Sequence, residues 1–438
     1  MSDQSRYLIK GNQPVSGRIK GLGAKNFATK AMVAALLAKG TTKLLNTPRI
    51  GDVEITCEML EASGAKLTWH DDGLEIDASN LYSSKVPVPD SGSNRIPILL
   101  LSVLLQRLGE AHVPAVSGCN IGARPVDFHL TAAQMFGAEI DVQRDGYHAT
   151  RKGALKACHY KLPYPSVGAT ESCLFLGVLA KGTSIIENVA TEPEIIALIT
   201  MLNSMGACVQ LLPNRELIIE GVDELYGTSF EVLGDRIEAA SWAALAAATD
   251  GEITVDGIDP ATLINFFGPF NKVGGGVSIE GPKSIKFFRR KPLQSTVIET
   301  DVFPGFATDW QQPFAVMLTQ AKGTSIIHET VYERRFDYLN ALSALGARTQ
   351  IETHCLGSVD CRFRGRDFPH SAIIQGPSAL RSEGLSLDVP DLRAGLAYVM
   401  AAALAEGETT ISSISRIERG YGDLISRTKD LSLAITKI

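Results

Sequence analysis

The pattern of hydrophobic and polar positions repeats along the chain. An Ala- and Leu-rich run with helical spacing ends at a glycine, and a run of β-branched residues follows, as in AALLAKGTTKLLN and GVLAKGTSIIEN. A glycine just past the last helical turn adopts the left-handed conformation without steric cost, and the run after it favours a strand. This phrase recurs six times, with its glycines at Gly40, Gly109, Gly182, Gly251, Gly323 and Gly407.

A second phrase follows each of the first five glycines. It is another helical run that ends in Gly-Ala or Gly-Gly before a strand, as in LEASGAKL and LNSMGACV, and the sixth copy, KDLSLAIT, lacks the glycine. The glycines of this phrase are Gly64, Gly137, Gly206, Gly274 and Gly346. Each unit of about 70 residues therefore predicts a helix, a cap, a strand, a loop, a second helix, a second cap and further strands.

Six such units predict the architecture. The chain has 438 residues, a length that suits two or three domains. We expect an α/β protein of two domains with three units each. Chance similarity between common helix ends is the alternative, but five copies have matched internal spacings of 23 to 28 residues, and this favours true repeats.

Composition excludes several classes of protein. The chain has 42 basic and 48 acidic residues and a net charge of −6, so a surface that wraps nucleic acid is not expected. Basic side chains that do gather would then form a local anion site. No apolar run is long enough for a transmembrane helix, and the N-terminus lacks the apolar core of a signal peptide.

The cysteines predict no metal site. Seven cysteines are widely spread and form neither a CxxC pair nor a Cys/His cluster with zinc spacing. We expect reduced thiols in the cytosol, most of them small core residues. They are Cys57, Cys119, Cys158, Cys173, Cys208, Cys355 and Cys361.

Two segments suggest anion sites. Lys25 and Asn26 lie between a glycine-rich turn and a helix, where free backbone N–H groups and the helix dipole favour anions. A solvated first-turn lysine is the alternative. In YPSVGATES, residues 164–172, Ser166, Gly168 and Thr170 offer hydroxyls and N–H groups ahead of a helix, although the spacing is not that of a Walker A loop.

One cysteine stands in a setting that favours reactivity. Cys119 lies between Gly118 and Gly122, and Arg124 and the expected helix N-cap Asp127 follow it. An arginine and a helix N-terminus favour the thiolate. A buried loop cysteine is an equally open alternative at this point.

Other polar residues follow later in the chain. Asp309, in FPGFATDWQQP, suits a general base or a helix N-cap, and these roles are compatible. Arg393 and Arg419 are each expected to open a helix, where the dipole does not favour a cation, so an anionic ligand is one explanation and a surface salt bridge the other. The segment VYERRFDYL, residues 331–339, also departs from what packing alone would select.

Together these segments resemble the enolpyruvyl transferase superfamily. The resemblance covers nearly the whole chain, and the branch that acts on UDP-N-acetylglucosamine is the most similar. Its marks here are GAKN (23–26), GCNIGARPVD (118–127), SVGAT (166–170), TEPEI (191–195), DRIEA (235–239), PGFATDWQ (304–311), DLRAG (391–395) and RGY (419–421).

The resemblance implies a fold and a reaction. The fold would be an inside-out α/β barrel of two domains with three βαβαββ units each, a discontinuous domain of residues 1–22 and 233–438 and an inserted domain of residues 23–232. The active site would lie in the interdomain cleft. The reaction would transfer the enolpyruvyl group of phosphoenolpyruvate to the 3-hydroxyl of UDP-N-acetylglucosamine and release phosphate, the first committed step of peptidoglycan synthesis. No metal, organic cofactor, nucleic acid or membrane partner is implied, and the oligomeric state stays open.

The resemblance also implies roles for single residues. Lys25, Arg124 and Arg419 match residues that hold the phosphate and carboxylate of phosphoenolpyruvate. Cys119 matches the cysteine that protonates the enolpyruvyl methylene and that fosfomycin alkylates, and Asp309 matches the carboxylate at the sugar hydroxyl. The positions that match the UDP-sugar site are Asn26, Arg95, Pro125, Val126, Asp127, Phe128, Ser166, Val167, Gly168 and Val331, and Arg335 and Arg393 match further cleft residues.

Several positions depart from the pattern of the superfamily, namely Ser117, Asn120, Tyr164, Thr191 and Gly422. They affect the expected substrate affinity and leave the chemical residues in place. Two alternatives remain, an enolpyruvyl transferase for another nucleotide such as UMP, and a non-catalytic protein that binds a UDP-sugar. The SVGAT and RPVD segments argue against the first, and the retained Cys119 and Asp309 argue against the second.

Overall fold

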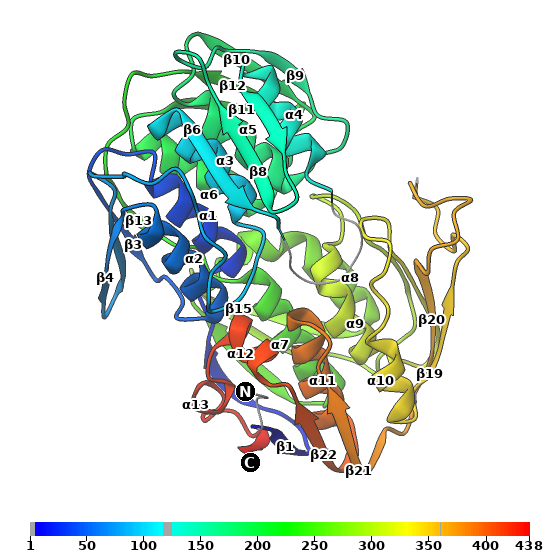
Figure 1. Cartoon of the computed structure of the whole chain (residues 1–438). Helices are drawn as coiled ribbons and strands as arrows, with labels where there is room; N and C mark the ends of the chain where they lie inside the picture. Colours follow the sequence, from blue (N-terminus) through cyan, green and yellow to red (C-terminus); the bar gives the residue numbers. More distant parts are fainter. Residues whose placement is uncertain (1–4, 117–124, 360) are drawn as a thin grey trace. The chain divides into compact units, whose positions relative to one another are not determined.

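The chain folds into two compact units. A computed structural model describes residues 5–116, 125–359 and 361–438. Unit 1 contains the described residues up to Leu22 and those from Gly234 onward, and unit 2 contains those from Gly23 to Leu233 (Figure 1).

Unit 2 is built from six helices and eleven strands among its described residues. The helices are α1 (Lys25–Ala35), α2 (Gly51–Ala62), α3 (Pro97–Leu108), α4 (Asp127–Met135), α5 (Val167–Gly177) and α6 (Pro193–Ser204). The strands are β3 (Thr41–Leu45), β4 (Lys66–His70), β5 (Gly73–Asp77), β6 (Glu110–Pro114), β7 (Glu139–Val142), β8 (Gly146–Thr150), β9 (His159–Lys161), β10 (Thr183–Glu187), β11 (Cys208–Leu212), β12 (Glu216–Glu220) and β13 (Ser229–Glu231).

Unit 1 combines the start of the chain with its second half. Its helices are α7 (Arg236–Ala248), α8 (Ile264–Val273), α9 (Gln311–Leu318), α10 (Leu339–Ala344), α11 (Leu392–Leu404), α12 (Ser415–Tyr421) and α13 (Leu424–Arg427), with 3-10 helices η1 (Pro260–Leu263) and η2 (Thr308–Trp310). Its strands are β1 (Tyr7–Lys10), β2 (Gly17–Lys20), β14 (Glu252–Asp256), β15 (Gly275–Gly281), β16 (Ser284–Arg289), β17 (Val297–Glu299), β18 (Gly323–His328), β19 (Arg348–Glu352), β20 (Ser371–Gly376), β21 (Arg381–Asp388), β22 (Glu406–Ser412) and β23 (Ala434–Lys437).

The sheets follow the sequence repeats. The described residues form three sheets in each unit, in the orders β13-β3-β5-β4, β6-β8-β7 and β11-β12-β10-β9 in unit 2 and β15-β16-β14-β2, β17-β18-β20-β19 and β21-β22-β1-β23 in unit 1. Every four-stranded sheet contains one parallel pair, and its other pairs are antiparallel.

Strand pairing explains why unit 1 is discontinuous. Strand β1 pairs with β22 and β23, and β2 pairs with β14, so the first strands complete sheets of the second half of the chain. In unit 2, β13 pairs with β3, and the end of that unit therefore returns to its beginning.

The central helices of each unit are buried on most of their surface. In unit 1, α7, α9 and α11 pack against one another, and every residue of α7 and α9 is buried (Figure 1). In unit 2, α3 packs against α1 and α5, and ten of the twelve residues of α3 are buried. A helix that is apolar around its whole circumference needs such an interior position.

The glycine caps are confirmed at Gly109 and at the five glycines of the second phrase, which lie within two residues of their helix ends. They are not confirmed at Gly40, Gly182, Gly323 and Gly407, which lie three to five residues beyond the ends of their helices. Ten of the eleven repeat glycines have positive φ angles, for example 105° at Gly64 and 108° at Gly323. The exception is Gly251, where the preceding Asp250 takes the positive φ of 59° instead. A Cβ on Gly251 would lie 2.1 Å from the carbonyl oxygen of Val15, so close backbone approach explains this glycine.

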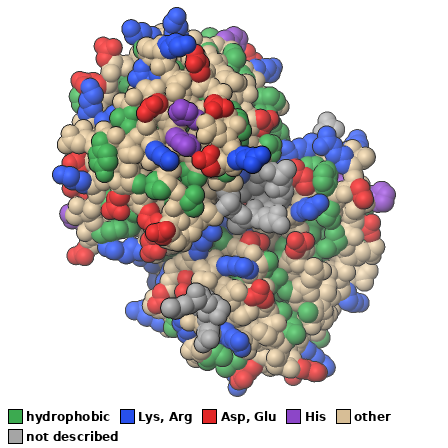
Figure 2. Space-filling view, viewed as in Figure 1, with side chains coloured by type: hydrophobic (Ala, Val, Ile, Leu, Met, Phe, Trp, Pro, Cys, Tyr) green, Lys and Arg blue, Asp and Glu red, His purple; other side chains and the backbone are tan. Residues whose placement is uncertain are grey.

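Two expectations about surface and core can be compared with the structure. No helix among the described residues has the length and apolar character to span a membrane, and Figure 2 shows basic and acidic side chains interspersed over the viewed face of both units. The expectation that most cysteines are core residues is wrong. Of the six in the described part of the chain, only Cys173 and Cys361 are buried, because the others lie in loops, at strand ends or on partly exposed helix faces.

Candidate functional site

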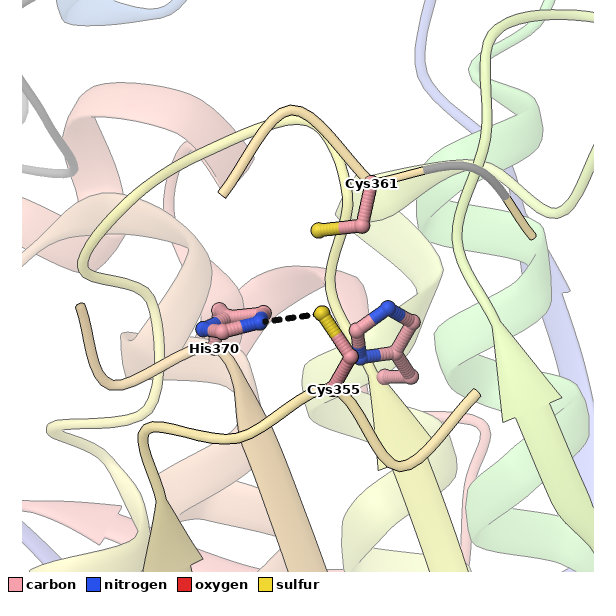
Figure 3. Close-up of side chains that lie close together, drawn as sticks. Cys355, Cys361 and His370 are labelled. Carbon is pink, nitrogen blue, oxygen red and sulfur yellow. Dashed lines mark hydrogen bonds between the residues drawn. The ribbon is translucent and has the colours of Figure 1, made fainter. Parts of the chain in front are cut away.

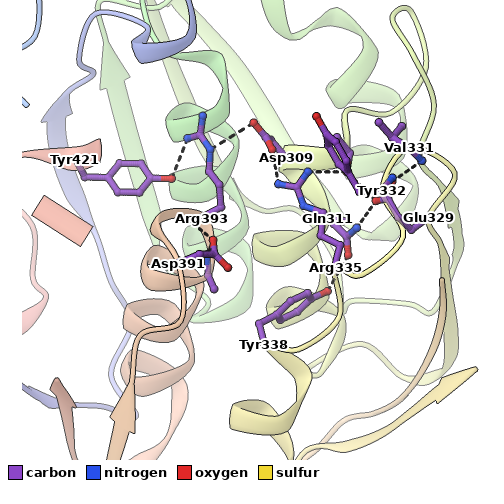
Figure 4. A network of polar contacts seen from close by, with 12 residues as sticks. Asp309, Gln311, Glu329, Val331, Tyr332, Arg335, Tyr338, Asp391, Arg393 and Tyr421 are labelled. Carbon is purple, nitrogen blue, oxygen red and sulfur yellow. Dashed lines mark hydrogen bonds and ion pairs between the residues drawn. The ribbon is translucent and has the colours of Figure 1, made fainter. Parts of the chain in front are cut away.

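In unit 1 the structure brings Asp309 together with two predicted arginines. Asp309 lies in η2, and its Oδ1 forms an ion pair with Nη2 of Arg335. Its Oδ2 lies 3.4 Å from Nε of Arg393, on α11 (Figure 4). The arginine side chains are 2% and 8% exposed and the Asp309 side chain 22%, so the carboxylate is the accessible member of the group.

A buried carboxylate, Glu329, holds the neighbouring loop in place. Its Oε1 accepts hydrogen bonds from the backbone N–H groups of Val331 at 2.7 Å and Tyr332 at 3.1 Å. Its Oε2 accepts from Gln311 and, at 2.7 Å, from the hydroxyl of Thr308. We call the set Thr308, Asp309, Gln311, Glu329, Arg335, Arg393 and Tyr421 the Asp309 network (Figure 4).

Arg393 is held from two directions. Its Nη1 donates to the hydroxyl of Tyr421 at 3.1 Å, and Asp391 caps α11 by accepting from the backbone N–H of Arg393 at 2.9 Å. Burial lowers the pKa of Arg393, but Tyr421, Asp309 and Asp235 raise it more, and the net pKa lies well above the usual value. Arg393 therefore stays charged although it is buried, and the surface salt bridge alternative does not apply.

Two interpretations of these residues are wrong. Asp309 is not an N-cap, because Ala307 takes that position at η2 and Trp310 at α9, and the Asp309 carboxylate faces the arginines instead. Arg419 does not open a helix. It lies in the last turn of α12, where the helix dipole favours a cation.

In unit 2 the predicted lysine has an unpredicted partner. Lys25 is the first residue of α1, and its Nζ lies 2.7 Å from Oδ2 of Asp52, in the first turn of α2. The two side chains are 19% and 7% exposed. A solvated first-turn lysine is therefore not what the structure contains.

The YPSVGATES segment folds partly as predicted. Ser166 caps α5 by accepting from the N–H of Ala169. Thr170, however, is fully buried. Its hydroxyl donates to the backbone carbonyl of Ser166 and accepts from the backbone N–H of Ala190, so it stabilises the fold and is not directed at a ligand. A Cβ on Gly168 would lie 2.8 Å from Cε1 of His129, and this close contact between α4 and α5 requires the glycine.

The remaining described positions lie at the starts of helices. Asn26 is in α1, Arg95 precedes α3, Pro125 and Val126 precede α4, Phe128 is in α4, and Val167 is the first residue of α5. Asp127 is the first helical residue of α4 and not its N-cap, which is Val126.

Burial, with a smaller contribution from Arg95, lowers the pKa of His129 to about 3, so this histidine is neutral.

Cys119 and Arg124, with Ser117 and Asn120, lie outside the described residues.

Of the positions that depart from the superfamily pattern, Gly422 has a structural reason to be glycine. It ends α12 at φ 65° and ψ −160°, a conformation open almost only to glycine.

Sequence reasoning missed several members of these groups. Asp52, Glu329 and Tyr421 are buried polar side chains that contact predicted residues. In the sequence, Tyr421 is marked only by its place in the RGY motif. For Glu329 a signal existed, because a carboxylate directly after an apolar strand-like run, SIIHE, needs partners when buried.

The fold and the match to a family model define the class of protein. The family model described as EPSP synthase (3-phosphoshikimate 1-carboxyvinyltransferase) matches residues 9–427, and the chain belongs to this family of enolpyruvyl transferases. The enolpyruvyl transferase NikO from Streptomyces tendae superposes with a TM-score of 0.85 over 99% of this chain and 98% of that one, at 23% identity. The predicted two-domain α/β fold class is thereby confirmed.

Comparison with curated relatives narrows the range of related proteins further. A protein of Protochlamydia amoebophila is 43% identical over 98% of this chain and 94% of its own length, and one of Chlamydia pneumoniae is 42% identical over 96% and 92%. A protein of Nostoc sp. is 35% identical over the whole chain and 94% of its own length. All three are named UDP-N-acetylglucosamine 1-carboxyvinyltransferase.

Proposed function

We propose that the protein transfers the enolpyruvyl group of phosphoenolpyruvate to the 3-hydroxyl of UDP-N-acetylglucosamine and releases phosphate, the first committed step of peptidoglycan synthesis. The observation that carries the proposal is 35–43% identity, over nearly the full length, to relatives named for this activity. Both substrates are metabolites of the cytoplasm, so the proposal places the reaction there.

The chemistry is an addition followed by an elimination. The acceptor oxygen bonds to C2 of phosphoenolpyruvate while C3 gains a proton, and the tetrahedral ketal then loses a proton from C3 together with phosphate. We assign Asp309 to the proton of the sugar hydroxyl, because its carboxylate is partly accessible and is fixed by two buried arginines. A group held in this way needs no reorganisation when charge develops.

We assign the anionic groups of the substrates to basic side chains. Lys25, Arg124, Arg393 and Arg419 are proposed to bind the phosphate and carboxylate of phosphoenolpyruvate. Nη2 of Arg393 is buried and makes no hydrogen bond to another described residue, and it is therefore a donor suited to an anion. Arg335 is directed at Thr308 and Asp309, so we propose that it positions the carboxylate.

The UDP-sugar is assigned to the remaining matched positions. They are Asn26, Arg95, Pro125, Val126, Asp127, Phe128, Ser166, Val167, Gly168 and Val331. Helix N-termini at α1, α4 and α5 give this set backbone N–H groups that suit a diphosphate.

Cys119 is proposed to deliver the proton to the methylene carbon. Cys119→Ser should remove covalent labelling by fosfomycin, and Cys119→Asp should keep turnover while it resists the drug, because aspartate still supplies a proton. Full labelling of Cys119→Ser would place the reactive thiol elsewhere.

Phosphate release tests the function directly. The protein is incubated with phosphoenolpyruvate and, in separate reactions, with UDP-N-acetylglucosamine, UMP or shikimate 3-phosphate. Release that depends on the UDP-sugar is the expected result. Release only with UMP or shikimate 3-phosphate would keep the chemistry and reject the acceptor, and binding of the UDP-sugar without release would favour a non-catalytic role.

A further inference from the structure

Four potential metal ligands gather at one end of a sheet in unit 1. The ligand atoms of His328, Cys355, Cys361 and His370 all lie within 4.8 Å of one another. His328 ends β18, His370 directly precedes β20, and both cysteines belong to the connection between β19 and β20 (Figure 3). Both histidines and Cys361 are buried, and Cys355 is partly buried.

Hydrogen bonds fix the tautomer of His328. The hydroxyl of Ser371 donates to the carbonyl of His354 at 2.7 Å, and its oxygen therefore accepts from Nδ1 of His328 at 2.9 Å. The lone pair of His328 is then on Nε2, a buried atom that makes no hydrogen bond to any other described residue. A buried imidazole nitrogen without a partner is costly in an apolar setting.

His370 is oriented in the same way. Its Nδ1 donates to the backbone carbonyl of Phe368 at 2.7 Å, and Nε2 faces Sγ of Cys355 at 3.3 Å (Figure 3). Both imidazoles thus use Nδ1–H for an oxygen of the protein and turn Nε2 toward the cysteines. This is the arrangement in which metal-binding histidines are held by their outer hydrogen bonds.

We propose that His328, Cys355, Cys361 and His370 form a structural zinc site. Two thiolates and two imidazoles suit tetrahedral Zn²⁺, with Zn–S of about 2.3 Å and Zn–N of about 2.0 Å. Such a tetrahedron places its ligand atoms about 3.3 to 3.8 Å apart, so small side-chain rotations would close the group around an ion. Four protein ligands leave no open position, which indicates a structural role.

The site would fasten the connection between β19 and β20 to the sheet. Glu299, at the end of β17, accepts backbone hydrogen bonds from Ser358 at 2.8 Å and Val359 at 2.7 Å, between the two cysteines. A Cβ on Gly357 would lie 2.5 Å from Cδ2 of His328, so the chain here runs tightly over the histidine. His328 also immediately precedes Glu329 of the Asp309 network.

Metal content tests the proposal without reference to activity. The protein is treated with a chelator, dialysed, supplied with zinc or cobalt, and analysed by elemental mass spectrometry and absorption. One zinc per chain is expected, with cobalt giving thiolate charge-transfer bands and the strong visible bands of a tetrahedral site. The melting temperature is expected to fall by several degrees on chelation.

The matched variants decide which residues hold the metal. Cys355→Ser with Cys361→Ser should weaken zinc binding at least 100-fold, whereas Cys158→Ser with Cys208→Ser should leave it unchanged. Equal binding by both double variants would overturn the proposal, and so would wild-type protein that takes up no zinc.

Thiol labelling of wild-type protein does not depend on how the variants fold. Zinc should protect Cys355 and Cys361 from iodoacetamide while Cys208 still reacts. Equal labelling with and without zinc would overturn the site. A Cys355–Cys361 disulfide, seen as a loss of two hydrogens in the non-reduced protein that zinc does not prevent, would also overturn it.

Discussion

The two units present their proposed functional residues in different ways. In unit 1, Asp309, Arg335 and Arg393 come from three separate segments and compensate one another's charge in a partly buried network. In unit 2, one ion pair, Lys25 with Asp52, lies beside helix N-termini and largely neutral contacts such as His129 with Ser172. Unit 1 therefore offers fixed charges, and unit 2 offers mainly backbone donors with the cations Lys25 and Arg95 among its described residues.

The difference suggests a division of labour. Groups fixed before the substrate arrives suit chemistry in which charge develops. Helix N-termini suit the binding of a phosphorylated ligand whose charge does not change. Substitutions in unit 1 should therefore affect turnover most, and substitutions in unit 2 should affect binding or stability.

The largest effect is expected from Asp309→Asn. The amide cannot take a proton, so kcat should fall by about 10²- to 10⁴-fold, while the affinity for UDP-N-acetylglucosamine, measured by calorimetry, changes little. Asp259→Asn, at an exposed helix cap of the same unit, is the control and should keep full turnover. Equal loss of binding and turnover in Asp309→Asn would contradict the proton role.

Lys25→Ala should have the next largest effect. Loss of a charge-assisted contact of about 1.5–3 kcal/mol predicts a kcat/KM for phosphoenolpyruvate about 10- to 100-fold lower. The variant also leaves Asp52 without this partner and should unfold at a lower temperature.

A second variant separates the two roles of Lys25. Lys25→Ala with Asp52→Asn should regain the lost stability without regaining kcat/KM. If the double variant recovers both, Lys25 acts only through its ion pair.

Tyr421→Phe should have a smaller effect. It removes the hydroxyl that accepts from Arg393 at 3.1 Å, a contact worth about 1 kcal/mol, and KM for phosphoenolpyruvate should rise several-fold. Tyr398→Phe, a buried tyrosine on the same helix as Arg393, should leave KM unchanged. A similar rise in both variants would point to general loosening of α11.

The smallest effect concerns pH and unit 2. Burial raises the pKa of Glu171 from 4.5 to about 7, with Lys30 opposing and Glu192 and Glu194 adding to the rise. The folded state thus binds this proton more tightly than the unfolded state, so the free energy of unfolding should fall as the pH rises from 4.5 to 7.

Glu171→Gln should reduce this pH dependence and melt a few degrees above wild type at pH 8. Glu139→Gln, at an exposed ion pair, is the control and should follow wild type. A wild-type melting curve that does not change between pH 5 and pH 8 would count against the assignment.

Much of the fold was predictable because its signals are local. A helix that ends at Gly64 or Gly109 reflects the left-handed backbone of its own cap, and the strand after it reflects the shape of its side chains. At Gly251 the same signal had another cause, the close approach of Val15. The pattern could not reveal this, because β2, which follows Val15, reaches β14 from more than 200 residues away.

The candidate site was predictable only in part. The residue types at Lys25, Asp309 and Arg393 indicated charge chemistry, and their burial was not visible in the pattern. The partner Asp52 was missed because it stands in no unusual local sequence, and Glu329 was missed although it follows an apolar strand-like run. Thr170 was overvalued because a hydroxyl beside a helix start suits a ligand and a buried backbone contact equally well.

The sequence by itself determined the repeats, six of the eleven expected caps and the residue types available for chemistry, because these depend on backbone conformations a few residues long. Only the tertiary structure decided which side chains meet. Asp309 reaches Arg393 on α11, and His328 joins Cys355, Cys361 and His370, because strands and helices distant in sequence pack together. Such contacts depend on the pairing of whole elements, and no local pattern of hydrophobic and polar residues encodes them.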